Sequence, residues 1–240
     1  MLALLTFDLD GTLANTEQLK AESYAWAAHR LDPDLNPDDV EAAYPEHVGR
    51  SREEIARALT ERFGLAEAAR ERDGSVEPWE SYVALRLERY RAMLADGDLV
   101  RGHARDEAVA LARAGRDLAR NTALVTTSDR RNTDAVLAAL GLTDAFDTIV
   151  TADDVDRTKP DPEGYRLALA RVGADADAAL GIEDSPAGLR GALAAGIAVV
   201  AVPTDFTRDA IGEMVAEGEL DAGAVVEPAD LDAAVRRRAR

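Results

Sequence analysis

The chain opens with a short apolar run that ends in two aspartates and a glycine. Residues 2–7 read LALLTF, and the sequence DLDGTL follows at 8–13, with Asp8 and Asp10 two positions apart. This pattern predicts a buried strand that ends in a sharp turn, with two carboxylates at its carboxyl end. Ligands of open α/β sheets bind beyond the carboxyl ends of strands. Paired carboxylates there suit either of two tasks, holding a hard cation through oxygen or attacking an electrophile.

The first strand has no partner nearby in the sequence. From about residue 15 to about residue 98 the apolar positions recur at helical spacing, and the polar stretch 67–77 is expected to be a loop. A lone strand is not stable. We therefore expect residues 15–98 to be an inserted helical domain, after which the sheet resumes.

Beyond residue 99 short β-prone runs alternate with helical patterns. The expected strands cover 122–125, 146–151, 179–182, 197–202 and 224–226. Such alternation predicts an α/β fold with a parallel sheet and right-handed crossovers. The predicted domains are a core of residues 1–14 and 99–240 and a helical domain of residues 15–98.

Polar residues follow three of the later strands. They are Thr126 with Thr127 and Ser128, Lys159, and the pair Glu183 and Asp184. In a parallel sheet all of them meet the first two aspartates at one edge. Carboxylates this close repel one another unless a cation lies among them, and all-oxygen ligands favour Mg²⁺ over zinc or copper.

Four segments in this order resemble the four motifs of the haloacid dehalogenase-like (HAD) phosphohydrolase superfamily: DLDGTL at 8–13, Thr126, Lys159, and the pair at 183–184. The helical block resembles the small helical cap inserted after the first motif in the β-phosphoglucomutase and phosphoglycolate phosphatase branch. The resemblance implies a HAD-like Rossmannoid parallel-sheet core with an inserted helical cap.

The resemblance also implies catalytic roles. Asp8 would be the nucleophile that forms an aspartyl-phosphate. Asp10 would protonate the leaving alcohol and then activate water. Thr126 and Lys159 would hold and neutralise the phosphoryl oxygens.

Metal and substrate ligands are implied in the same way. Mg²⁺ would be held by Asp8, the backbone carbonyl of Asp10, Asp184 and Glu183. In the alternative, Glu183 contacts the metal ligands and does not bind the metal itself. Thr127 and Ser128, which follow the second strand, are further candidates for binding substrate.

The stretch HVGRSR at 47–52 is a basic turn that opens a helix in an otherwise acidic chain. It resembles the substrate loop of the β-phosphoglucomutase-like branch. That resemblance implies that Arg52, with Gly49 in the same loop, contacts a distal phosphate or sugar, and arginine at a helix N-terminus suits an anion. The alternative is a solvated helix start, since Ser51 and Glu54 have the spacing of a capping box.

Some positions depart from the family pattern. Residues 101–103 read RGH where Arg-Pro-Gly is usual, and residues 116–121 look like extra positions before the second strand. The first helix lacks the histidine that the mutase branch carries near residues 20–23, which argues against a mutase.

The leading prediction is a Mg²⁺-dependent phosphatase of a small phosphorylated metabolite, such as a sugar phosphate or phosphoglycolate. A β-phosphoglucomutase-type mutase is the main alternative. A 2-haloacid dehalogenase lacks the second aspartate, so Asp10 argues against one, and a non-enzymatic binding module of the same fold is the remaining alternative.

Composition excludes several other classes. The formal net charge of −18 disfavours nucleic acid as a partner. The absence of cysteine excludes disulfides and thiolate metal sites. No apolar run reaches the ~20 residues of a membrane helix, and no signal peptide is visible. We expect a cytoplasmic protein that is a monomer or weak homodimer.

Overall fold

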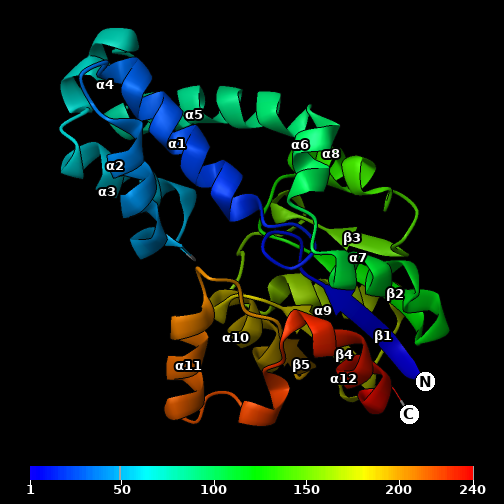
Figure 1. Cartoon of the computed structure of the whole chain (residues 1–240). Helices are drawn as coiled ribbons and strands as arrows, with labels where there is room; N and C mark the ends of the chain where they lie inside the picture. The colour runs from blue at the N-terminus through cyan, green and yellow to red at the C-terminus, as the bar shows by residue number, and fades with distance from the viewer. Residues whose placement is uncertain (49, 240) are drawn as a thin grey trace. The chain divides into compact units, whose positions relative to one another are not determined.

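A computed structural model describes residues 1–48 and 50–239, and the chain divides into two compact units. One unit consists of Met1–Asn15 together with Gly97–Arg240, and the other is Thr16–Asp96. The first unit contains the sheet and the second is helical (Figure 1).

The sheet has five strands in the order β3-β2-β1-β4-β5, and every neighbouring pair is parallel. The strands are β1 (Leu2–Phe7), β2 (Ala119–Val125), β3 (Thr148–Val150), β4 (Ala179–Glu183) and β5 (Ala198–Ala201). The predicted α/β class with a parallel sheet is confirmed. Because all strands run the same way, the carboxyl ends of β1, β2 and β4 lie at one edge.

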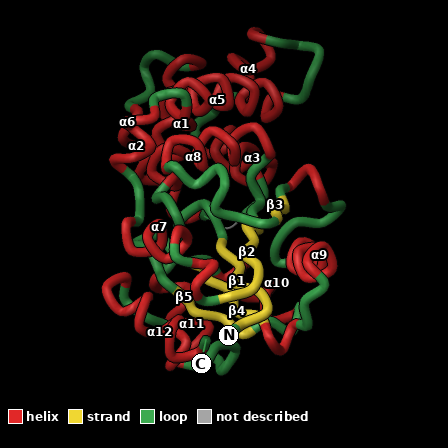
Figure 2. Tube along the Cα trace, turned by 90° about the vertical axis from the view of Figure 1, so that its right-hand side faces the viewer, coloured by secondary structure: helices red, strands yellow, loops and turns green. Residues whose placement is uncertain are grey.

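β1 is central because its residues are apolar on both faces. The side chains of Leu4 and Leu5 point to opposite faces, and neither is exposed to solvent. Leu4 belongs to the apolar cluster that α9 and α10 complete through Tyr165 and Leu189. Figure 2 shows α9 and α10 on one side of the sheet and α7 and α12 on the other.

The helices of this unit connect successive strands or follow the last one. They are α6 (Gly97–Gly102), α7 (Asp106–Arg113), α8 (Arg130–Leu140), α9 (Glu163–Val172), α10 (Pro186–Ala194), α11 (Arg208–Ala216) and α12 (Leu231–Arg238).

In the second unit the described residues form five α-helices that pack around aromatic side chains. They are α1 (Thr16–Leu31), α2 (Pro37–Ala43), α3 (Arg52–Arg62), α4 (Ala66–Arg72) and α5 (Pro78–Leu94). The ring of Tyr24 lies 5.7 Å from that of Tyr44 and 5.6 Å from that of Tyr82. The capping box expected from Ser51 and Glu54 is present at the start of α3. Among the described helices, none combines the length and apolar character that crossing a membrane requires.

The expected loop at 67–77 was wrong in its first half. Residues Ala66–Arg72 form α4, in which Ala69 is buried. The segment AEAARER is polar but consists of strong helix formers, so propensity and packing against α5 outweigh the lack of a broad apolar stripe.

Three expected strand boundaries also differ. β2 begins at Ala119, three residues before the expected start, so part of the segment that looked like extra positions belongs to the strand. β3 is only Thr148–Val150. The expected strand at 224–226 is reduced to a single bridge between Ala201 and Val225.

Candidate active site

The turn after β1 places Asp8 at the carboxyl edge of the sheet. The backbone N–H of Asp8 donates to the carbonyl of Ile182 in β4 at 3.0 Å, which continues the ladder beyond the strand. Gly11 follows with φ +88°, and a Cβ atom there would lie 2.1 Å from Oδ2 of Asp184. Only glycine therefore permits both the turn and the close approach of the Asp184 carboxylate.

Lys159 joins the ends of three strands through its ammonium group. Its Nζ donates to Oδ1 of Asp8 and to Oε1 of Glu183, each at 2.5 Å, and to the carbonyl of Val125 at 2.7 Å. The lysine side chain is only 6% exposed. Its three donors are thus committed to the end of β1, the end of β2 and the end of β4.

Burial and charge shift the pKa values of this pair. Burial raises the pKa of Asp8 to about 7, against the opposing effect of Lys159, and the charges of Glu183 and Asp10 add to the rise. Burial alone would lower the pKa of Lys159, but Asp8 and Glu183 outweigh it and hold that pKa well above its usual value. The lysine is therefore a fixed cation among carboxylates.

The end of β4 supplies two more carboxylates. Glu183 is fully buried and Asp184 is 1% exposed. Oδ1 of Asp184 accepts a hydrogen bond from the Thr12 hydroxyl at 3.1 Å. Ser185 caps α10 by accepting from the N–H of Gly188 at 3.1 Å, which fixes the direction in which the chain leaves the strand.

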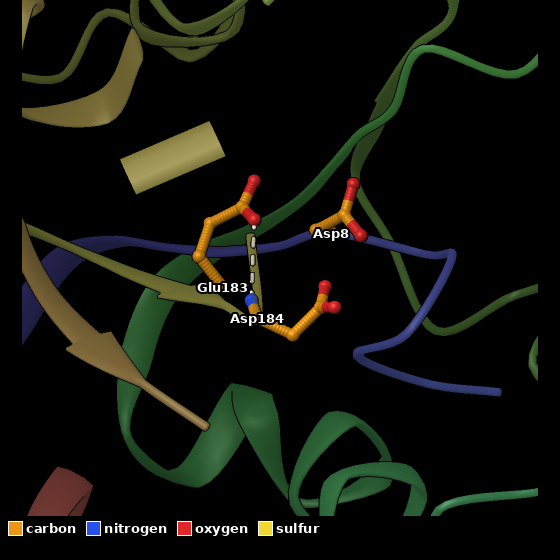
Figure 3. A group of neighbouring side chains, drawn as sticks. All are labelled: Asp8, Glu183 and Asp184. Atoms are coloured by element: carbon orange, nitrogen blue, oxygen red, sulfur yellow. Dashed lines mark hydrogen bonds between the residues drawn. The ribbon is translucent and has the colours of Figure 1, made fainter. Parts of the chain in front are cut away.

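Asp8, Glu183 and Asp184 lie around one space (Figure 3), and one carboxylate oxygen from each lies within 4.8 Å of the others. Oxygen donors and negative charge are what Mg²⁺ prefers, so the carboxylates of Asp8 and Asp184 fit a hard divalent cation here, with the Glu183 carboxylate beside them. The predicted metal site therefore has a suitable set of donors.

The end of β2 contributes hydroxyl groups. Oγ1 of Thr126 accepts from the N–H of Ser128 at 3.1 Å, and the Ser128 hydroxyl donates to Oδ2 of Asp10 at 2.6 Å. Thr126 and Ser128 are buried, whereas Thr127 is exposed. The structure therefore connects Thr126 and Ser128 to the aspartates, and it gives Thr127 no such link.

The chain matches a known hydrolase family over most of its length. A family model described as haloacid dehalogenase-like hydrolase matches residues 2–196. The chain belongs to the haloacid dehalogenase-like hydrolase family. The predicted resemblance is confirmed, and with it the prediction of an enzyme, a hydrolase of this family.

Named HAD relatives extend over nearly the whole chain. Protein CbbY of Rhodobacter capsulatus is 34% identical, over 86% of this chain and 88% of its own length. Phosphoglycolate phosphatase of Rhodospirillum rubrum is 30% identical, over 87% of this chain and 82% of its own length. Relatives at this similarity include proteins named as phosphatases, in agreement with a phosphoric monoester hydrolase.

A solved HAD structure has the same fold. A crystal structure of mutant CbbY from Rhodobacter sphaeroides in complex with xylulose-(1,5)bisphosphate aligns with a TM-score of 0.67 and 28% identity, over 87% of this chain and 89% of that one.

Two predicted residues belong to the helical unit. Arg52 is the first residue of α3 and is exposed, next to the Ser51 cap. Gly49 lies outside the described residues. The role of this loop in substrate binding stays a prediction.

Two residues of interest were not singled out by the sequence. Tyr165 lies on the buried face of α9, and its hydroxyl donates to Oε1 of Glu183 at 2.5 Å. Arg86 of α5 is 4% exposed, with its guanidinium carbon 4.7 Å from the ring centroid of Tyr24 and 4.5 Å from that of Tyr90. In the sequence, the position of Tyr165 is typical of a core aromatic residue and that of Arg86 of a solvent-facing one. Only the contacts in the structure show that both are buried next to other polar or aromatic groups.

Proposed function

We propose that this HAD hydrolase is a Mg²⁺-dependent phosphatase that acts on a small phosphorylated metabolite through an aspartyl-phosphate. The observation that carries the proposal is the buried set of Asp8, Lys159 and Asp184 at the carboxyl edge of the sheet. A carboxylate nucleophile needs no base to activate it, and the neighbouring lysine matches the charge of phosphoryl oxygens.

In this mechanism an oxygen of Asp8 attacks phosphorus and the alkoxide leaving group departs. Asp10 donates a proton to that alkoxide and later takes one from the water that attacks the aspartyl-phosphate. The hydrogen bond from Ser128 holds the Asp10 carboxylate in one orientation. Lys159 and Thr126 stabilise the charge that spreads over the phosphoryl oxygens.

Mg²⁺ would be held by Asp8, by Asp184 and by the backbone carbonyl of Asp10. When bound, it would neutralise the carboxylates and draw charge from the phosphoryl group. The hydroxyl of Thr12 holds Asp184 in place for this task.

Selection of the substrate is proposed to fall to the helical unit. Arg52 is exposed at the start of a helix. Its guanidinium suits an anionic or sugar group distant from the scissile phosphate. The named substrates of the relatives, such as phosphoglycolate, are of this small anionic kind.

The test is hydrolysis of p-nitrophenyl phosphate with Mg²⁺ and with EDTA. We expect Asp8→Asn to lose roughly a thousandfold or more of kcat, because it removes the nucleophile. Asp10→Asn should accumulate a hydroxylamine-sensitive aspartyl-phosphate. Undiminished turnover in Asp8→Asn would remove the proposal.

A panel of phosphorylated metabolites then identifies the substrate class. Arg52→Ala should raise KM for substrates with a second anionic group more than for p-nitrophenyl phosphate, since the latter has no such group. Formation of glucose 6-phosphate from glucose 1-phosphate, instead of release of inorganic phosphate, would favour the mutase alternative.

A further inference from the structure

The carboxylate of Glu183 is buried and fully hydrogen bonded. Its Oε1 accepts from Nζ of Lys159 and from the hydroxyl of Tyr165, each at 2.5 Å. Its Oε2 accepts from the N–H of Asp184 at 3.2 Å and from the hydroxyl of Ser185 at 3.3 Å. A carboxylate offers about four lone-pair sites. The four donors therefore fill these sites, and no lone pair of Glu183 is left to bind a metal ion.

The backbone also closes one side of this carboxylate. A Cβ atom at Gly188 in α10 would lie 2.0 Å from Cδ and Oε1 of Glu183 and 2.1 Å from Oε2. The first turn of α10 thus packs directly on the carboxyl group. The Glu183 side chain is therefore restrained by the backbone of α10 on one side and by its four hydrogen-bond donors.

Tyr165 contacts both members of the Glu183–Lys159 ion pair. Its hydroxyl shares Oε1 of Glu183 with the lysine, and Nζ of Lys159 lies 5.3 Å from the centroid of its ring. Burial and then the charge on Glu183 raise the pKa of Tyr165 well above its usual value, so the phenol remains a donor.

We propose that Glu183 and Tyr165 are positioning residues for Lys159, and that Glu183 is not a ligand of the cation. Glu183 supplies a counter-charge that draws Nζ away from Asp8. Tyr165 competes for the same oxygen and weakens that attraction, so Nζ stays between Asp8 and Glu183. Lys159 is then held where it can stabilise phosphoryl oxygens next to the nucleophile.

The first test identifies the ligands directly and needs no activity. In crystals of the wild-type protein soaked with Mn²⁺, the anomalous peak should lie at about 2.0–2.3 Å from oxygens of Asp8 and Asp184 and beyond about 3 Å from both oxygens of Glu183. A Glu183 oxygen within bonding distance would overturn the assignment. This result stands even if the proposed phosphatase function fails.

The second test rests on the proposed function and uses Tyr165→Phe, which removes one hydroxyl and keeps the ring. We expect kcat for p-nitrophenyl phosphate to fall about tenfold with KM within about twofold of wild type. Inhibition by orthovanadate, which mimics the transferring phosphoryl group, should weaken by a similar factor. Inhibition by inorganic phosphate should change less than about twofold.

Tyr82→Phe is the matched control, because it removes a buried tyrosine hydroxyl, which donates to the carbonyl of Tyr24 in the helical unit. We expect it to lower the melting temperature and leave orthovanadate inhibition unchanged. Equal weakening of orthovanadate and phosphate inhibition in Tyr165→Phe, or no change in either, would overturn the positioning role. Absence of phosphatase activity in the wild-type protein would instead refute the proposed function.

Discussion

The carboxyl group of Asp8 is buried, and burial disfavours its ionised form. It is 6% exposed, and burial raises its pKa to about 7 although Lys159 contacts it. The unfolded chain has the ordinary value of 3.8. The folded state therefore binds the proton more tightly, and the stability that this group contributes at low pH is lost as the pH rises to about 7.

We predict that Asp8→Asn stabilises the metal-free protein at high pH, because asparagine cannot ionise. The gain in the free energy of unfolding should be on the order of a few kcal/mol at pH 8 and smaller at pH 5, because the wild-type carboxyl is ionised in the folded state only at the higher pH. Urea unfolding in EDTA at both pH values measures the difference in the free energy of unfolding between the variant and wild type. A variant less stable than wild type at pH 8 would contradict the assigned pKa.

Mg²⁺ provides the control for this prediction. If Mg²⁺ is held by the wild-type carboxylates as proposed, it should stabilise wild type more than the variant and narrow the difference in stability between them. The same substitution removes the proposed nucleophile, so activity and stability are expected to move in opposite directions.

Residues that carry charge at strand ends could be predicted from the sequence. Asp8, Lys159 and Asp184 follow β-prone runs, and a parallel sheet must bring them to one edge. Tyr165 could not be predicted in the same way. Its position in an apolar helical stripe is typical of a core aromatic, and only the fold reveals that its hydroxyl reaches Glu183.

At the scale of elements, Arg105 links the start of α7 to two loops of the site. Its guanidinium donates to the carbonyls of Gly11 at 2.5 Å, Val202 at 2.9 Å and Pro203 at 3.3 Å. Gly11 lies in the turn that carries Asp10, and its Cα faces the carboxylate of Asp184. One side chain therefore fixes the turn after β1 against the loop after β5.

We predict that Arg105→Met lowers both stability and turnover. Three carbonyls lose a charged donor, which should cost about 2–3 kcal/mol in the free energy of unfolding. The turn after β1 also loses its restraint, so kcat should fall about tenfold or more. Thermal unfolding and p-nitrophenyl phosphate kinetics measure the two effects.

Arg113→Met is the control for this prediction, because Arg113 also donates to a backbone carbonyl, that of Leu140 at 2.7 Å, away from the site. It should lose some stability and keep its turnover. An unchanged kcat in Arg105→Met would show that the turn is held without this clamp.

Element boundaries were the weaker part of the sequence-based prediction, for two physical reasons. Ala119–Asn121 join β2 through pairing with β1, although Arg120 is exposed and Asn121 is polar, because backbone hydrogen bonds and not burial extend the strand. The run at 224–226 is apolar enough for a strand but meets β5 at one bridge only. Strand order and type follow from the alternating pattern, whereas strand length depends on neighbours.

At the scale of the whole molecule, charge is the dominant feature. The formal net charge is −18, and only two of the 28 basic residues are lysines. Many arginines pair with exposed carboxylates, as Arg57 does with Glu53 and Arg190 with Glu219. Exposed pairs of this kind contribute under about 1 kcal/mol each, and the excess of acidic groups leaves a net repulsion that opposes compact folding.

We predict that NaCl stabilises this protein. Raising NaCl from about 0.05 M to about 1 M shortens the screening length from more than 10 Å to about 3 Å. Repulsion among the surplus carboxylates should then fall more than the attraction within the exposed ion pairs, because acidic residues outnumber basic ones. We expect the melting temperature at pH 7.5 in EDTA to rise by about 3–8 °C. At pH 5.5, closer to the isoelectric point of 4.5, the net charge is smaller and the same salt should have clearly less effect. An equal response at both pH values would mean that salt acts through burial of apolar surface instead of through charge, and a fall in melting temperature would mean that the attractive pairs outweigh the surplus of acidic residues.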